Sequence, residues 1–97
     1  MRHEAAIDRL RRAVLEGPGE LPRHVREALV VGEPAPEPFT GYVEQVRRHA
    51  YRVTDGEVEE LVAATSEEAV FEATVAAALG AGLDRLDAGL AALEAAR

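Results

Sequence analysis

The chain contains neither cysteine nor lysine. Without cysteine it can form no disulfide bond, no thiolate metal ligand and no redox-active thiol. All 11 basic side chains are arginine, so no lysine is present to form a Schiff base with a carbonyl substrate. Serine occurs once, at Ser66, outside any Gly-x-Ser-x-Gly turn of the kind that carries a hydrolase nucleophile. These absences exclude several large classes of covalent catalysis.

Aromatic residues and long apolar runs are also scarce. Two Phe and two Tyr occur among 97 residues, so the core must be built from leucine, valine and alanine. The longest weakly polar run, residues 73–83, is too short and too rich in alanine and glycine to span a bilayer. No charged segment followed by an apolar one opens the sequence. We therefore expect no membrane association, no secretion and a cytoplasmic location.

Acidic residues outnumber basic ones, and the formal net charge is −7. Much of the excess lies in residues 54–72, which hold seven carboxylates and no arginine. A surface that binds nucleic acid needs a basic stripe to meet the phosphates, so no nucleic-acid partner is expected. Solvated helix faces and helix N-termini are the ordinary places for such carboxylates. An adaptor whose acidic face meets a basic partner is an alternative that rests on charge alone.

The spacing of apolar residues predicts five helices and no strand. The first three are expected at about 3–16, 22–32 and 38–52, separated by Gly17-Pro18-Gly19 and by a proline-rich connector. Thr54 and Glu57 form a capping-box pattern at the start of the fourth helix, and Thr65 or Ser66 can cap the fifth. A chain of this length forms one domain. We predict a single all-α domain over 1–97, with N-terminal helices and a connector in 1–37 and a helical core in 38–97.

The fifth predicted helix has an unusual composition. Leucine recurs along it at alternating steps of four and three residues, the spacing of a helix–helix seam: Leu79, Leu83, Leu86, Leu90 and Leu93. Alanine and glycine flank this leucine seam, and each glycine inside a helix costs about 1 kcal/mol relative to alanine. Gly80, Gly82 and Gly89 therefore indicate close approach by another helix. We expect the predicted helix 38–52 to be the main packing partner within the chain.

The length of the fifth helix indicates a partner outside the chain. At about 1.5 Å per residue, a helix of about thirty residues is about 45 Å long. A compact chain of this size has a radius of gyration of about 12.5 Å and a diameter of about 30–35 Å. One compact domain cannot cover such a helix, so we expect a homo-oligomer held by the C-terminal helix.

Two segments of the chain resemble a known superfamily. Residues 65–86, TSEEAVFEATVAAALGAGLDRL, form a short acidic turn followed by an alanine-rich helix, and residues 42–54, YVEQVRRHAYRVT, lead into a Val-Thr-Asp turn. In this order they resemble the C-terminal part of the carboxymuconolactone decarboxylase and alkylhydroperoxidase-D-like superfamily, over about Phe39 to Leu93. The resemblance implies an all-helical fold that associates through its helices. The peroxidase branch depends on a Cys-x-x-Cys-x-x-x-His element, which this chain lacks, and no functional residue carries over.

His49 is the strongest candidate for acid–base chemistry, because it lies in the matched segment and histidine acts readily near neutral pH. Arg47 or Arg48 could clamp a substrate carboxylate through a bidentate fork. Adjacent helix residues point about 100° apart, so at most one of the two arginines can face a given pocket. The alternative is a partly exposed histidine near a helix end beside surface ion pairs such as Glu44–Arg48. We take His49 and Arg48 as the candidate catalytic residues.

No cofactor and no metal ion are expected. Helical di-iron proteins use Glu-x-x-His motifs on two helices, and no histidine here follows a glutamate at that spacing. His24 and Glu27 occur in the reverse order, without a second copy. Tyr42 and Tyr51 are expected to bury their rings against the core with a wet hydroxyl.

The leading functional hypothesis is a non-catalytic, self-associating member of the carboxymuconolactone decarboxylase-like group, without thiol peroxidase activity. The alternative is a cysteine-free enzyme or small-ligand binder of the same superfamily. That alternative would use His49 and an arginine at a pocket between subunits.

Overall fold

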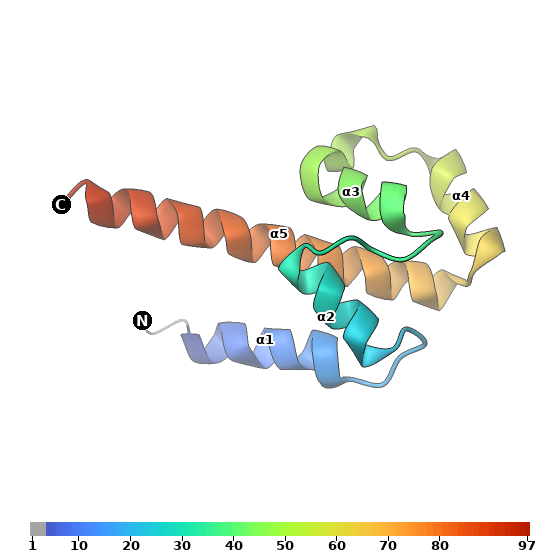
Figure 1. The fold of residues 1–97 in the computed structure, drawn as a ribbon, viewed down its shortest axis with the longest axis horizontal. Coiled ribbons are helices and arrows are strands. Elements are labelled where there is room, and N and C mark those ends of the chain that lie inside the picture. Colours follow the sequence, from blue (N-terminus) through green and yellow to red (C-terminus); the bar gives the residue numbers. More distant parts are fainter. Residues whose placement is uncertain (1–3) are drawn as a thin grey trace.

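The computed structural model describes residues 4–97, which form an all-helical fold without strands. These residues form five α-helices, labelled in Figure 1, and one short 3₁₀-helix. Their bounds are α1 Glu4–Glu16, α2 Arg23–Val31, α3 Thr40–His49, η1 Ala50–Arg52, α4 Asp55–Ala64 and α5 Glu67–Ala95. The predicted all-α class is confirmed, with a long C-terminal helix as expected. The predicted start of the first helix, at His3, lies outside the described residues.

The starts of α4 and α5 are fixed by hydroxyl caps. Thr54 Oγ1 accepts a hydrogen bond of 3.2 Å from the Glu57 amide, and Ser66 Oγ accepts one of 3.0 Å from the Ala69 amide. Each bond satisfies a backbone donor that has no partner within the helix. Ser66 is therefore the N-cap of α5, whereas Thr65 is the C-cap of α4.

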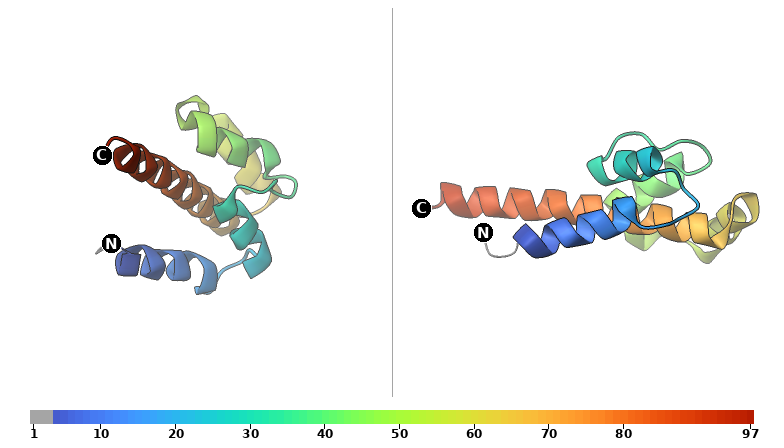
Figure 2. Two further views of the ribbon diagram at one scale, coloured as in Figure 1. Left: turned by 60° about the vertical axis from the view of Figure 1, so that its left-hand side comes forward. Right: turned by 90° about the horizontal axis from the view of Figure 1, so that it is seen from below.

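The first half of α5 is the centre of the fold. Its buried residues are nearly all small: Ala69, Val70, Ala73, Ala76, Ala77, Gly80 and Ala81. Both α2 and α3 lie against this half (Figures 1 and 2). The core that they form with α4 includes Leu29, Phe39, Val43 and Leu61. Small side chains on α5 thus allow several helices of the same chain to pack on it closely.

The main packing partner of α5 is α2, and the expectation that the helix after Pro38 would have this role was wrong. The reason is a close approach of main chains at Gly80. A Cβ atom at Gly80 would lie 2.0 Å from the carbonyl oxygen of Val30, near the end of α2. Only glycine fits there. At Gly82 and Gly89, by contrast, a Cβ atom would meet nothing within 4 Å.

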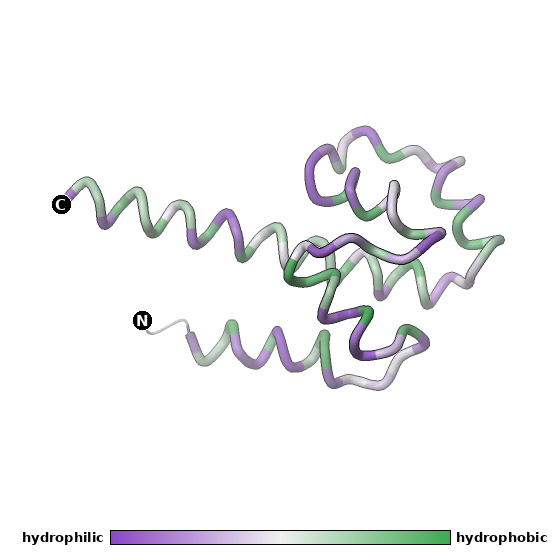
Figure 3. Tube along the Cα trace, viewed as in Figure 1, coloured by the Kyte–Doolittle hydropathy of each residue, from purple (hydrophilic) through white to green (hydrophobic). Residues whose placement is uncertain are grey.

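The second half of α5 projects beyond the packed helices. The molecule measures 50 × 29 × 19 Å, with a radius of gyration of 14.6 Å. Figure 1 shows α1 running antiparallel to α5, with the beginning of α1 beside the projecting half. In Figure 3 hydrophobic turns continue along that half to its end. The compact part of the chain is thus too short to cover α5, as the sequence predicted.

Candidate functional site

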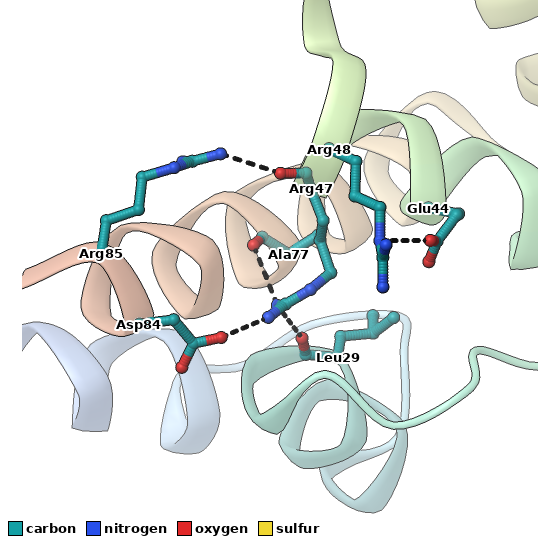
Figure 4. Close-up of polar contacts among 7 residues, drawn as sticks. All are labelled: Leu29, Glu44, Arg47, Arg48, Ala77, Asp84 and Arg85. Atoms are coloured by element: carbon teal, nitrogen blue, oxygen red, sulfur yellow. Dashed lines mark hydrogen bonds and ion pairs between the residues drawn. The ribbon is translucent and has the colours of Figure 1, made fainter. Parts of the chain in front are cut away.

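Arg47 is the polar centre of the packed region. Its side chain is only 15% exposed, and its guanidinium joins three helices (Figure 4). Nη1 lies 3.3 Å from the carbonyl oxygen of Leu29 and 3.4 Å from that of Ala77, and Nη2 donates to Asp84 Oδ2 at 2.7 Å. The backbone carbonyl of Arg47 in turn accepts a bond of 2.9 Å from Arg85. Arg47 therefore fixes α2 and α3 on α5 rather than standing free to bind a ligand.

Arg48 and His49, the two candidate catalytic residues, lie on the surface and face different neighbours. Arg48 Nε pairs with Glu44 Oε1 at 2.6 Å, which confirms the expected surface ion pair. The exposed His49 ring packs edge-on against Tyr51, with ring centroids 5.9 Å apart. Because Arg47 turns inward and Arg48 outward, the two arginines do not act on one pocket. A catalytic function of His49 stays a prediction.

The two tyrosines differ in their surroundings. The half-buried Tyr42 places its hydroxyl 2.6 Å from Thr74 Oγ1, so its polar end is paired with α5. Tyr51 is 79% exposed, and the expectation that it packs in the core was wrong. It lies in η1, directly after the end of α3, and the Arg52 guanidinium lies 5.6 Å from its ring centroid. Tyr51 is thus a surface residue.

Metal-ligating side chains are not gathered in the part of the chain that the structure describes. Within residues 4–97 no group of three or more histidines and carboxylates is placed to hold a metal ion. Glu27, the residue considered with His24, accepts a hydrogen bond of 2.8 Å from Arg23 Nε instead. In the same residues no helix combines the length and the apolar character needed to cross a membrane.

An apolar surface on α1 and the second half of α5 is only partly covered by the rest of residues 4–97. We call it the candidate interface, and it comprises Ile7, Leu10, Leu83, Leu86, Leu90 and Leu93. Leu10 is 52% exposed, Leu86 41% and Leu93 56%. A groove of about 340 Å³ runs between the two helices here, with charged residues of both signs among its lining. The predicted leucine seam is therefore packed by its own chain at one end only.

Two charged residues that hold elements together, the buried Arg26 and the half-buried Glu72, were missed by reasoning from the sequence. Arg26 is 8% exposed, and Glu72 accepts hydrogen bonds from the amides of Glu20 at 2.9 Å and Leu21 at 3.1 Å. Glu72 thus holds the α1–α2 connector against α5. A signal for Arg26 was present, because it lies three residues before the buried Leu29 on the same helix face.

Comparison of the chain with protein-family models, with curated proteins and with solved structures found no match. The superfamily resemblance therefore rests on the residues of the two segments between Phe39 and Leu93.

Proposed function

We propose that the protein is a non-catalytic, self-associating helical module of the carboxymuconolactone decarboxylase-like group. Its copies assemble through the candidate interface, and the cytoplasmic location expected from the sequence is part of the proposal. One observation carries it: the leucine seam of α5 continues past the end of the packed core into solvent. Fully burying one such side chain contributes about 1.5–3 kcal/mol.

A second copy fits this surface because α1 and α5 form half of a helical bundle. A pair of antiparallel helices buries one face of each, and a second pair across it completes a four-helix arrangement. A two-fold axis would bring the same apolar residues of both copies together. Gly82 and Gly89 leave open space on the flank of α5, so the main chain of the second copy can approach it.

The charges that line the groove are of both signs but mainly acidic. Arg11 lies on one wall, and Glu4, Asp8 and Asp87 are the other charged lining residues. In an antiparallel pair of copies, Arg11 of each copy can face a carboxylate of the other. Exposed pairs of this kind contribute at most about 1 kcal/mol, so they set orientation while the leucines supply the affinity.

The test is the mass in solution, measured by light scattering over a dilution series. We expect wild type to exceed the monomer mass of 10.4 kDa at micromolar concentration. Leu90→Glu should be monomeric, because a carboxylate buried without a partner is costly. Ala88→Glu is the matched control, since it adds the same charge on the exposed opposite side of α5 and should leave the mass unchanged. A wild-type mass of 10.4 kDa at every concentration would refute the proposal.

Catalysis is not part of the proposal. No peroxide reduction with thiol donors is expected, because the chain has no cysteine. The alternative site, built on His49 with Arg47 or Arg48, stays a prediction and gains less support. Arg47 is bound to Asp84 and to two carbonyl groups, and Arg48 is bound to Glu44.

A further inference from the structure

Two aspartates line the groove of the candidate interface from opposite sides. Asp8 lies on α1 and Asp87 on α5, and both side chains are exposed. Arg11, also exposed on α1, is the one cation among the described residues that line this groove. None of the three forms an ion pair within residues 4–97. All three charges are therefore accessible to a second copy.

The position of the packed helices favours a second copy that lies antiparallel to the first. α2, α3 and α4 lie toward the beginning of α5, and its second half projects beyond them (Figure 1). Two copies in the same direction would bring these packed parts together at one end, whereas antiparallel copies place them at opposite ends. With the two grooves facing each other, a two-fold axis perpendicular to α5 lays α5 on α5 and α1 on α1. The two leucine seams then pack directly on each other.

On α1 the antiparallel arrangement brings opposite charges together. Asp8 and Arg11 are three residues apart, so they are neighbours on one face of the helix. When the two-fold axis passes midway between them, Arg11 of each copy faces Asp8 of the other. One symmetric contact thus forms two ion pairs. Glu4 is not required for these pairs, since it already takes part in another interaction.

On α5 the same arrangement brings like charges together. The charged residues of α5 that line the space between α1, α2 and α5 are Asp84 and Asp87. Asp84 is bound to Arg47, and Asp87 forms no ion pair. The neighbouring Arg85 donates to the Arg47 carbonyl and does not line the groove. Packing α5 on α5 therefore places Asp87 against a helix face that offers no cation, and like charges across an interface are unfavourable.

We propose that the two aspartates act in opposite directions on self-association. Asp8 favours it by pairing with Arg11 of the second copy, and Asp87 opposes it. This inference rests on the proposed function, because it describes how two copies align at the same interface. An exposed ion pair contributes little by itself, but the two-fold axis doubles each contact. The leucines supply the affinity, and the charges select one alignment of the two seams.

The experiment compares the dissociation constants of wild type, Asp8→Asn and Asp87→Asn, measured by light scattering over a dilution series at low salt. Both side chains are exposed, so neither variant disturbs the core. Glu59→Gln is the matched control, because it removes one negative charge from the exposed surface of α4, outside the groove. Relative to this control, we expect association to be about threefold to thirtyfold weaker in Asp8→Asn and tighter by a similar factor in Asp87→Asn. In about 1 M salt these differences should largely disappear, because charges are then screened over about 3 Å.

A charge exchange between copies identifies the pair that forms. Arg11→Glu and Asp8→Arg should each associate weakly alone, because like charges then meet at the α1 contact. Mixed in equal amounts, the two variants should form a heterodimer, since both contacts then join opposite charges. Arg11→Glu mixed with Asp87→Arg is the control and should show no such preference. Native mass spectrometry of the two mixtures distinguishes the heterodimer from the homodimers.

The possible outcomes separate this inference from the proposed function. If wild type associates but the two asparagine variants shift association in the same direction, or not at all, the opposite roles are rejected and self-association stands. Preferential pairing of Arg11→Glu with Asp87→Arg would also overturn the inference, because it would place α1 of one copy on α5 of the other. If wild type and Asp87→Asn are both monomeric at every concentration, the proposed function and this inference are rejected together.

Discussion

Gly80 is the residue at which the main chains of α2 and α5 come closest. A methyl group there would collide with the carbonyl oxygen of Val30 and with the Arg47 guanidinium, at 2.0 and 2.7 Å. We predict that Gly80→Ala lowers the free energy of unfolding by about 1–3 kcal/mol, the usual range for overpacking. Stability falls although alanine is a better helix former than glycine. The free energy of unfolding of wild type and of Gly80→Ala is measured by urea denaturation.

Gly82→Ala is the control for this prediction. It lies on the same helix, two residues away, in open space. Here the substitution should stabilise by about 1 kcal/mol, because only helix propensity changes. Both variants are best compared in a Leu90→Glu background, where association does not contribute. Similar stability of the two variants would mean that α2 does not approach α5 at Gly80.

The arginines illustrate how much of the site could be predicted from the residues. The sequence indicated that Arg47 and Arg48 point in different directions, and the ion pair of Arg48 with Glu44 was predicted from helix spacing. The inward position of Arg47 was not predicted. Its acceptors are Asp84 and two carbonyl groups on other helices, and their approach depends on tertiary packing.

At the scale of an element, the best-defined boundary is the start of α4. Thr54 extends its backbone before the helix and accepts the Glu57 amide through its hydroxyl. We predict that Thr54→Ala destabilises the protein by about 1 kcal/mol, the usual contribution of a capping oxygen. Thr54→Ser keeps the hydroxyl and should restore most of this stability in urea melts. If serine and alanine were equally destabilising, the cap would not be the cause.

The starts of α4 and α5 and the end of α2 could be predicted because capping and turn formation depend on residues close together in the sequence. The third helix was expected to run to Arg52, but α3 ends at His49 and the chain continues as η1. Thr54, Ser66 and Gly32 each act on backbone within a few positions of themselves. The order of helix packing could not be predicted in this way. The alanines of α5 suit either α2 or α3 as a neighbour, and only the approach at Gly80 favours α2.

At the scale of the whole molecule, we expect stability to depend on protein concentration. If assembly covers the candidate interface, mass action stabilises the folded state as concentration rises. The thermal midpoint of wild type should therefore increase over a hundredfold range of concentration, and circular dichroism can follow it. Leu90→Glu should melt at a lower and constant temperature. A midpoint of wild type that does not change with concentration would contradict the prediction.

The extended outline of the molecule has a hydrodynamic consequence. Its radius of gyration of 14.6 Å exceeds the value of about 12.5 Å for a compact chain of this length, because half of α5 stands clear of the core. Such a particle meets more friction than a sphere of equal mass and leaves a sizing column early. Two copies overlapping only along their projecting halves would form a longer particle still. Elution volume would then overstate the number of subunits, and the axial ratio from small-angle scattering becomes a readout of how far the two copies overlap.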